Sequence, residues 1–410
     1  MSDKQNSLRQ ELRALPPAAW VLFLGVFLNK FGTFVLPFLT IYMTRLGYST
    51  RQAGLTVGAY GVGSLCAAFW GGYLADRFGR RKTIALSMFS GAMAMLCLSQ
   101  ARSIPTIMLL AAATGLTAEL YRPASTALLA DLVPPSQRVT AFAAHRLAMN
   151  AGFAFGPATA GFLAKNSFHW LFIGDAVSSI IFGLLAWFAL PKGVTGIRME
   201  NSLWDTVRVL RNDRRFRQVL LGSLVIAVVF VQILSSMSLE ITRSGFSPSV
   251  YGLVISLNGI LIVLCELPLT VVTKRFAVRR VIACGFLLIG LGFASNALVR
   301  TLPLLALTTI LFTVGEMIAL PISAAYIADL APAHQRGLYM GTYGLTWSLA
   351  FVCGPSLGLL LFSINPLALW LLCGVFGIIS ATIIIKEPER AKLRQSSAQL
   401  TGKQAEALVE

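Results

Sequence analysis

Four ionisable side chains lie in the middle of long apolar stretches, and their chemistry would let them bind ions or protons. Lys30 lies in FLNKFGTFVL, Glu119 and Arg122 lie three residues apart in ELYRPAS, and Glu316 lies in VGEMIALP. A carboxylate can exchange a proton, and an ammonium or guanidinium group can hold a carboxylate. A charge at bilayer depth costs at least about 2.5–3.5 kcal/mol, so such residues normally pair or line an aqueous path.

The composition identifies the surrounding medium as a lipid bilayer. Of 410 residues, 56% are hydrophobic and 12% are charged, whereas soluble proteins carry about 25% charged residues. Runs of about 20 apolar residues can cross the hydrocarbon core as helices, which pair their backbone groups internally. We predict an all-α membrane protein with 12 transmembrane helices at roughly 18–43, 51–75, 83–101, 105–131, 139–165, 168–191, 216–243, 249–273, 279–299, 302–330, 336–363 and 366–386.

The distribution of Lys and Arg predicts the orientation of the chain. If the N-terminus is cytoplasmic, most basic residues fall in cytoplasmic loops, and those on the opposite side are Arg45, Arg51, Arg102, Lys165, Arg243 and Arg300. This positive-inside bias predicts a multi-pass protein of the plasma (bacterial inner) membrane with both termini cytoplasmic. It also explains the net charge of +17 without a nucleic-acid partner. All six cysteines fall in predicted spans, with no spacing that suggests a metal site.

The chain is a tandem duplication with a constant offset of 198 residues. PASTALLADLVPPSQR at 123–138 matches PISAAYIADLAPAHQR at 321–336 at nine of sixteen positions without a gap. Two six-span units of this kind form two pseudo-symmetric bundles related by an axis along the membrane normal, with a site between them. The expected organisation is a cytoplasmic N-terminal segment, a first bundle, a cytoplasmic linker, a second bundle and a cytoplasmic tail, at 1–17, 18–191, 192–215, 216–386 and 387–410.

The segment GYLADRFGRRK, residues 72–82, lies between the second and third spans. It resembles the signature loop of the major facilitator superfamily, and the resemblance extends over essentially all of residues 18–386. The resemblance implies the fold of that superfamily, with two bundles that alternate access to a central site. Helices one, four, seven and ten would line the cavity, which places Lys30, Glu119, Arg122 and Glu316 around it.

The same resemblance implies a conformational latch. The Asp76 carboxylate would dock on the start of span eleven and Arg80 would pair with Asp131, which would hold the outward-facing state. A topology anchor facing anionic headgroups is the simpler interpretation. Lys274 replaces Asp76 in the second copy, so its latch should be weaker or absent. The predicted latch residues are Gly72, Asp76, Arg77, Gly79, Arg80, Arg81 and Asp131.

Span five carries GFAFGPATAG, which resembles the pattern of superfamily members that exchange a substrate for protons. Small residues four or five apart also form a groove for a neighbouring helix, so helix packing alone is the other interpretation. The arginine that drug exporters usually carry in span four is missing, because Ala111 precedes Gly115 by four residues. The residues of this predicted packing motif and of its duplicate in span eleven are Gly152, Gly156, Pro157, Gly161, Gly354 and Pro355.

Proton coupling needs a group in mid-membrane whose protonation can change. Glu316 is the first candidate for the proton carrier because it would lie on a helix that lines the cavity. Glu119 and Arg122 could instead only neutralise each other's charge, without a role in transport. Arg146 and Asn150 could pair, contact substrate or anchor span five at the cytoplasmic surface. In the second copy, Val228 corresponds to Lys30 and Leu320 corresponds to Arg122. The repeated fold therefore does not need a basic residue at either position. The full set of predicted pathway residues is Lys30, Glu119, Arg122, Glu316, Glu266, Asp175, Asn29, Phe27, Phe34, Arg146 and Asn150.

We therefore expect a secondary active transporter that resembles drug:proton antiporters and exports small amphipathic compounds, including drugs or metabolites. Its expected partners are the lipid bilayer, a small-molecule substrate and protons, and we expect a monomer with no cofactor beyond the proton gradient. A proton-coupled importer of zwitterions such as peptides is the rival. A membrane-embedded enzyme or a receptor is disfavoured. The three histidines are not spaced like the ligands of a metal ion, and the sequence contains no phosphate-binding glycine loop.

Overall fold

The computed structural model describes residues 12–134, 137–192, 209, 211–273, 275–332 and 335–386. Within these ranges all regular elements are helical, and twelve segments are long and apolar enough to cross a membrane. The predicted all-α fold with twelve spans is therefore confirmed. The segment 1–17, the linker 192–215 and the tail 387–410 lie wholly or largely outside the described residues, as does Lys274.

The first six spans comprise eight helices, since spans one and four are each broken into two. Their bounds are α2 Pro17–Phe31, α3 Val35–Arg45, α4 Thr50–Phe78, α5 Arg80–Gln100, α6 Ile104–Glu119, α7 Tyr121–Leu132, α8 Arg138–Asn166 and α9 His169–Ala189. The second six contain α11 Arg214–Phe230, η2 Val231–Leu234, α12 Ser236–Arg243, α13 Pro248–Thr273, α14 Val278–Ala294, η3 Ser295–Leu298, α15 Leu302–Leu330, α16 Arg336–Ile364 and α17 Pro366–Ile385.

Local sequence explains where several helices begin and end. Ser49 starts α4 with a capping box, in which its hydroxyl accepts from the Gln52 N–H and its own N–H donates to the Gln52 side chain. Gly79 joins α4 directly to α5 with a φ of 92°, a conformation that glycine adopts without steric cost.

The duplication is visible in the structure at the same offset. Gly47 and Gly245, 198 residues apart, both have positive φ, at 88° and 86°. Arg81 donates to the Leu190 carbonyl just after α9, and its counterpart Arg279 donates to the Ile384 carbonyl at the end of α17. Each arginine thus holds carbonyls that a helix end leaves without an intrahelical partner.

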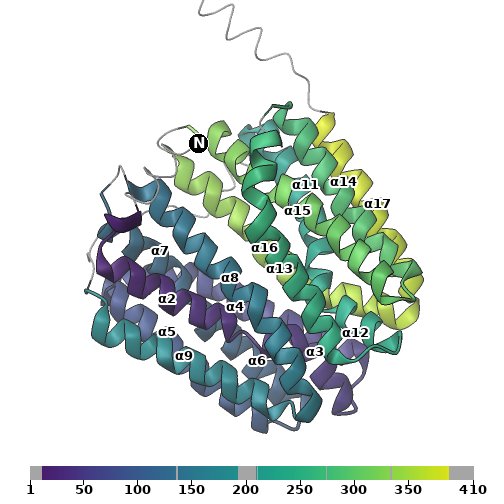
Figure 1. Ribbon diagram of the computed structural model, residues 1–410, viewed down its shortest axis with the longest axis horizontal. Coiled ribbons are helices and arrows are strands. Elements are labelled where there is room, and N and C mark those ends of the chain that lie inside the picture. The colour runs from purple at the N-terminus through teal and green to yellow at the C-terminus, as the bar shows by residue number, and fades with distance from the viewer. Residues whose placement is uncertain are drawn as a thin grey trace, which may run out of the picture.

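The two sets of six spans lie side by side and meet at the end that carries α3 and α12 (Figure 1). There α4 packs on α16 and α8 packs on α13 through glycines. A Cβ at Gly58 would lie 3.0 Å from the Val352 carbonyl oxygen, and one at Gly161 would lie 2.8 Å from the Ser249 Cα. At the opposite end, where α2 begins, a Cβ at Gly72 of α4 or Gly344 of α16 would meet nothing within 4 Å. These two helices therefore diverge towards that end.

The glycines of span five pack on two different helices. A Cβ at Gly152 would lie 2.6 Å from the Phe27 carbonyl oxygen of α2, and one at Gly156 would clash with the Phe31 carbonyl oxygen. Gly161 faces α13 of the other half, where the Pro157 carbonyl oxygen approaches Gly252. In span eleven, Gly354 faces Val231, and the Pro355 carbonyl oxygen would lie 2.9 Å from a Cβ on Gly54. Both copies of the motif thus lie at close helix contacts.

Spans one and seven are broken at corresponding positions. The chain leaves α2 after Phe31 and enters α3 at Val35, while α11 ends at Phe230 and α12 begins at Ser236. With the offset of 198 residues, the break at 32–34 corresponds to 230–232 and overlaps the break at 231–235. Broken helices expose backbone groups at membrane depth, which is tolerated where they are buried in protein or line a cavity.

Candidate functional site

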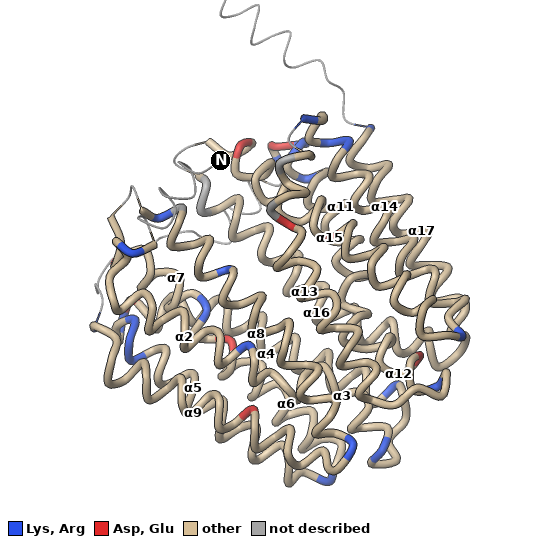
Figure 2. The backbone as a smooth tube through the Cα atoms, in the orientation of Figure 1, with Lys and Arg blue, Asp and Glu red and all other residues tan. Residues whose placement is uncertain are grey.

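A cavity of about 460 Å³ lies between the two halves, and ten α-helices and the 3-10 helix η2 contribute to its wall. Its charged lining residues are Lys30 of α2, Glu119 of α6, Arg122 of α7 and Glu316 of α15. The four ionisable residues that the sequence places in mid-membrane therefore line one cavity. Few other charged segments lie near the middle of the helices, and most gather at the ends (Figure 2).

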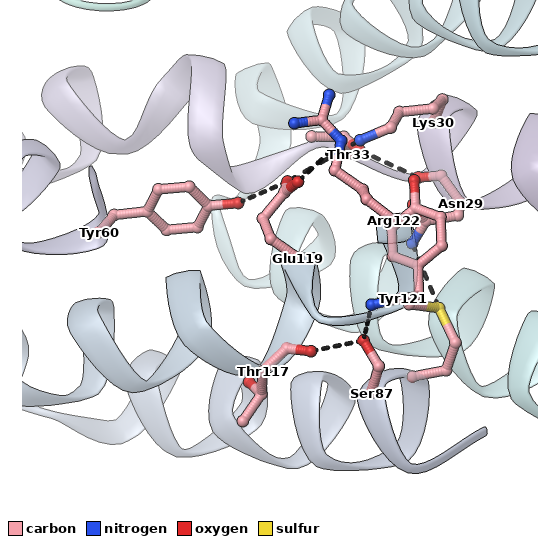
Figure 3. A network of polar contacts seen from close by, with 10 residues as sticks. Asn29, Lys30, Thr33, Tyr60, Ser87, Thr117, Glu119, Tyr121 and Arg122 are labelled. Atoms are coloured by element: carbon pink, nitrogen blue, oxygen red, sulfur yellow. Dashed lines mark hydrogen bonds and ion pairs between the residues drawn. The ribbon is translucent and has the colours of Figure 1, made fainter. Parts of the chain in front are cut away.

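Lys30, Glu119 and Arg122 form one ion-pair cluster in the first half (Figure 3). The Arg122 Nε lies 3.0 Å from Glu119 Oε2, and the Lys30 Nζ lies 3.9 Å from Glu119 Oε1. Lys30 and Glu119 are 12% and 13% exposed, whereas the Arg122 side chain is 53% exposed and faces the open cavity. The cluster carries a formal charge of +1, with its surplus on the exposed guanidinium.

Neutral side chains hold the cluster in place. The Tyr60 hydroxyl donates to Glu119 Oε1 at 3.3 Å, and the Lys30 Nζ lies 5.7 Å from the centre of the Tyr121 ring. The break between α6 and α7 falls at Leu120, so Glu119 and Arg122 lie on either side of it. Ser87 of α5 supports this break, because it donates to the Thr117 carbonyl and accepts from the Tyr121 N–H.

Glu316 has a different environment on the opposite wall. Its Oε2 accepts a hydrogen bond of 2.7 Å from the Asn258 side-chain amide, which also donates to the Thr313 hydroxyl at 3.0 Å. Among the residues that the structure describes, no ion pair of Glu316 is found. The second half thus presents a carboxylate whose hydrogen-bond partner is neutral.

The remaining wall of the cavity is largely apolar and aromatic. Phe230 and Trp347 pack edge to face with ring centres 5.8 Å apart. Together with Phe351 they place aromatic surface in the same half as Glu316. Aromatic faces attract cations and bury large apolar areas. This wall therefore combines a negative charge with aromatic surface.

Asp175, a predicted pathway residue, lies outside the cavity lining. It is 9% exposed on α9, and its Oδ2 accepts from the Val35 N–H, the first residue of α3, at 3.3 Å. The carboxylate therefore caps the helix that follows the break in span one. Asp175 lies there because the break in span one leaves the first N–H groups of α3 without intrahelical partners, and a carboxylate can accept from them.

Three further predicted residues on span one also face away from the cavity. Asn29 is buried and its side-chain amide contacts the Met88 sulfur at 3.5 Å. Phe27 stacks on Phe31, and Phe34 is 5% exposed and packs edge to face on that same ring. The rotation of α2 and the break after it explain these positions, because only one face of the helix reaches the cavity.

Arg146 and Glu266 form an ion pair between the two halves. The Arg146 Nη2 of α8 lies 2.5 Å from Glu266 Oε1 of α13, and neither residue lines the cavity. Asn150, one turn further along α8, does line it. Both Arg146 and Glu266 were predicted as pathway residues, but their contact with each other was not predicted.

The predicted latch residues lie around Arg80. This side chain is 6% exposed, and it contacts Asp76 at 2.7 Å and Asp131 at 3.2 Å. Asp76 is thus engaged with Arg80 in this structure. Arg77 donates to the Tyr73 hydroxyl, Arg81 lies over the Trp187 ring, and Gly72 faces open space.

The sequence interpretation missed two cavity residues, Tyr60 and Asn258. They are separated by 198 residues, and each donates a hydrogen bond to a cavity carboxylate of its own half. A comparison of the two copies for polar side chains in mid-span could have found them. The aromatic residues Phe230, Trp347 and Phe351 carry no such signal, because aromatic residues are common in all of these spans.

Comparisons with known proteins point to one family. The model of the Major Facilitator Superfamily matches residues 22–247 and 233–408. An uncharacterized MFS-type transporter from Bacillus subtilis, YttB, is 30% identical over 95% of this chain and 99% of its own length. A protein of Yersinia pestis named multidrug resistance protein MdtH is 26% identical over 84% of this chain and 88% of its own length.

Solved structures share the fold. The nucleoside transporter NupG superposes with a TM-score of 0.77 at 15% identity, covering 90% of this chain and 99% of NupG. A POT family transporter in complex with a thioalcohol-conjugated peptide superposes with a TM-score of 0.77 at 14% identity, covering 92% and 98%. At this identity the likeness is one of fold alone.

Proposed function

Since this chain belongs to the major facilitator superfamily, whose members and relatives named above are transporters and not enzymes, we propose that it is a proton-coupled exporter of small amphipathic cations. It is a multi-pass membrane protein that moves a small-molecule substrate across a bilayer. In this proposal the protein acts as a monomer in the bacterial inner membrane with both termini cytoplasmic. The cavity then faces the cytoplasm, because α4 and α16 diverge at the end where α2 begins.

The observation that carries this proposal is the neutral hydrogen-bond environment of Glu316. Glu119 is already compensated by Lys30 and Arg122, whereas Asn258 is the only side chain among the described residues that is found to donate to Glu316. A proton or an organic cation can therefore neutralise Glu316 without displacing a basic side chain. The two would compete for one carboxylate, and such competition couples the export of a cation to the entry of a proton.

The aromatic wall supports a substrate with an apolar body. Phe230, Trp347 and Phe351 lie in the same half as Glu316 and line the same cavity. A planar or branched organic cation would bury its apolar surface there and place its charge near the carboxylate. The name of the Yersinia relative, a multidrug resistance protein, is in keeping with such substrates.

The second candidate is a proton-coupled importer of small zwitterions. It is favoured by one observation, the opposite charges on the two walls. Arg122 is half exposed to the cavity in the first half, and Glu316 faces it from the second. A peptide could place its carboxylate near Arg122 and its amine near Glu316. A POT family transporter among the structural neighbours is described in complex with a conjugated peptide.

Transport in oriented vesicles separates the two candidates. A pH gradient is imposed that makes the lumen of inside-out vesicles acidic, or the medium outside right-side-out vesicles acidic. Ethidium or labelled alanyl-alanine is then added to the medium. For the exporter, the acidified lumen drives ethidium into inside-out vesicles. For the importer, alanyl-alanine enters right-side-out vesicles when the outside is acidic. Accumulation of the dipeptide and not of ethidium would overturn the first proposal.

Two substitutions at one position serve as variant and matched control. Glu316→Gln keeps the shape of the side chain and removes its proton exchange, so the pH gradient should no longer drive ethidium transport. Glu316→Asp keeps a carboxyl group and should retain gradient-driven transport at a reduced rate. Undiminished gradient-driven transport by Glu316→Gln would contradict the assigned role of this residue.

A further inference from the structure

A second cavity, of about 500 Å³, lies in the second half, at the end of the molecule that carries α12. It is formed where α12 ends, where the chain passes from η3 to α15, and where α17 begins. Side chains that line it include Glu240, Arg243, Arg300, Asn365, Leu367 and Trp370. None of them lines the central cavity. Figure 2 shows one acidic segment beside the α12 label with basic segments around it.

Glu240 is the buried charge of this second cavity. It is 8% exposed, and its Oε2 accepts a hydrogen bond of 2.9 Å from the Trp370 indole N–H. In the part of the chain that the structure describes, it forms no ion pair, and no hydrogen bond to its other oxygen is found. A buried carboxylate without a cation is costly. The site therefore favours a ligand that brings a cation with N–H donors to Glu240.

The rim of the cavity carries the opposite charge. Arg243 and Arg300 are both exposed. One nitrogen of Arg300 donates to the Val299 carbonyl at 2.7 Å, and within the described residues no hydrogen bond of its other N–H groups is found. Guanidinium groups match phosphate oxygens in geometry and charge. The rim thus favours an anion close to the cation that Glu240 would hold.

The first copy of the repeat shows which of these features the fold itself requires. Arg243 and Arg300 correspond to Arg45 and Arg102, so both copies have the arginines. Glu240 and Trp370 correspond instead to Tyr42 and Phe172, which pack edge to face with ring centres 5.0 Å apart. An aromatic pair thus fills the place of the carboxylate in the first copy. The buried Glu240 is specific to the second copy and is not a structural need of the repeat.

The surroundings of the cavity indicate a lipid rather than a soluble ligand. The apolar side chains beside it are strongly exposed, as on a surface that faces acyl chains: Leu298 at 68%, Leu302 at 52%, Ile364 at 75% and Leu367 at 53%. These residues lie at the ends of membrane spans, where headgroups are found. We propose that the second cavity binds a phospholipid with a phosphoethanolamine headgroup. Glu240 accepts from the ammonium, and Arg243 and Arg300 hold the phosphate.

Binding of matched lipids to the delipidated protein tests this proposal. The full-length protein in maltoside detergent is titrated with phosphatidylethanolamine, its N-methyl and N,N-dimethyl forms, phosphatidylcholine and phosphatidylglycerol, all with the same acyl chains, and binding is measured by native mass spectrometry. Affinity should fall stepwise as N–H donors are replaced by methyl groups, by at least about fivefold from the first lipid to phosphatidylcholine. Equal affinity across this series would overturn the proposal without any variant.

Variants in the two copies locate the site. Glu240→Gln should remove the preference for phosphatidylethanolamine over phosphatidylcholine and leave phosphatidylglycerol binding within about twofold. Arg300→Gln should weaken binding of all the phospholipids, whereas Arg102→Gln, its counterpart in the first copy, should leave the preference unchanged. A preference that survives Glu240→Gln, or that disappears in Arg102→Gln, would contradict the assignment.

A soluble headgroup separates a lipid site from a site for small zwitterions. Free O-phosphoethanolamine should not displace the bound lipid at concentrations tenfold above it, because it lacks the acyl chains. Displacement at equal concentration would assign the cavity to a soluble zwitterion instead. These measurements involve neither transport nor Glu316, so their outcome is separate from that of the transport assays.

Discussion

Asn258 donates a 2.7 Å hydrogen bond to Glu316, and this contact holds the carboxylate on the wall of the central cavity. The second N–H of the amide is held by Thr313, so the Asn258 side chain is itself oriented. In the first half the corresponding position is Tyr60, which donates to Glu119. Equivalent positions thus support two carboxylates, one compensated by basic side chains and one open to a ligand.

Replacement of Asn258 by Ala should weaken the binding of a cationic probe. A hydrogen bond to a charged group contributes about 1.5–3 kcal/mol, and a factor of ten in affinity is about 1.4 kcal/mol. We expect ethidium affinity to fall about tenfold, measured by fluorescence titration of the purified protein. The matched control is Tyr60→Phe, which should change affinity by less than about twofold because Glu119 keeps both basic partners. Equal losses in the two variants would contradict this assignment.

Glu119→Gln should destabilise the fold, and a second substitution should restore part of the loss. Removing one partner of a buried ion pair leaves the other charge uncompensated, at a cost of about 3–5 kcal/mol. In Lys30→Met/Glu119→Gln the mostly buried amine is gone too, and Arg122 is half exposed and can be solvated. The measurement is thermal unfolding followed by tryptophan fluorescence. A double variant that is less stable than Glu119→Gln would show that the pair is not coupled.

Charge reversal should reveal the contact between the two halves. In Arg146→Glu two carboxylates face each other across α8 and α13, and juxtaposed like charges cost several kcal/mol. We expect the transport rate to fall at least about tenfold, and Arg146→Glu/Glu266→Arg to recover it to within about threefold of the original. Rates are compared in proteoliposomes with matched protein content. A double variant as inactive as Arg146→Glu would argue against a direct contact.

Asp76→Asn removes the ion pair with Arg80 seen here, although Arg80 keeps its contact with Asp131. In the proposed latch it also removes the docking of Asp76 on span eleven in the opposite state, so we expect the balance to shift towards the state seen in this structure. An anion at a helix N-terminus contributes about 0.3–1 kcal/mol, up to about 2 kcal/mol. We expect a cysteine at Ser64, which lines the cavity, to react about threefold faster with a bulky maleimide. The assay requires a background in which the six native cysteines are replaced. A slower reaction in Asp76→Asn would reverse the proposed direction of the latch.

The fold could be predicted from the sequence because the bilayer restricts the solutions. Apolar runs of sufficient length must be helices, and the offset of 198 residues relates the two halves directly. The breaks in spans one and seven were not predicted. Gly32 at the break and Pro37 in the first turn of α3 are the local signals for the break in span one. The capping of Val35 by Asp175 joins segments 140 residues apart, and the local sequence does not reveal it.

The candidate site could be predicted only in outline. Charges at membrane depth are costly, so Lys30, Glu119, Arg122 and Glu316 stand out from their neighbours. The pairing of Glu119 with Arg122 follows from their spacing of three residues. The partners of Lys30 and Glu316 depend on the rotation and tilt of their helices, which one sequence does not reveal. Arg146 and Glu266 were both singled out, but their contact across the halves depends on how α8 and α13 pack. Asp76 is engaged with Arg80 in this structure, and its docking on span eleven in the outward-facing state stays a prediction.

Proton release on probe binding tests the central claim most directly. Purified protein in weakly buffered detergent is mixed with ethidium near neutral pH, and the released protons are counted with a pH indicator. If cation and proton compete for Glu316, the unmodified protein releases up to one proton per bound probe, and Glu316→Gln releases none although residual probe still binds at the aromatic wall. The same proton release from Glu316→Gln at equal occupancy would contradict the claim that this carboxylate couples the two.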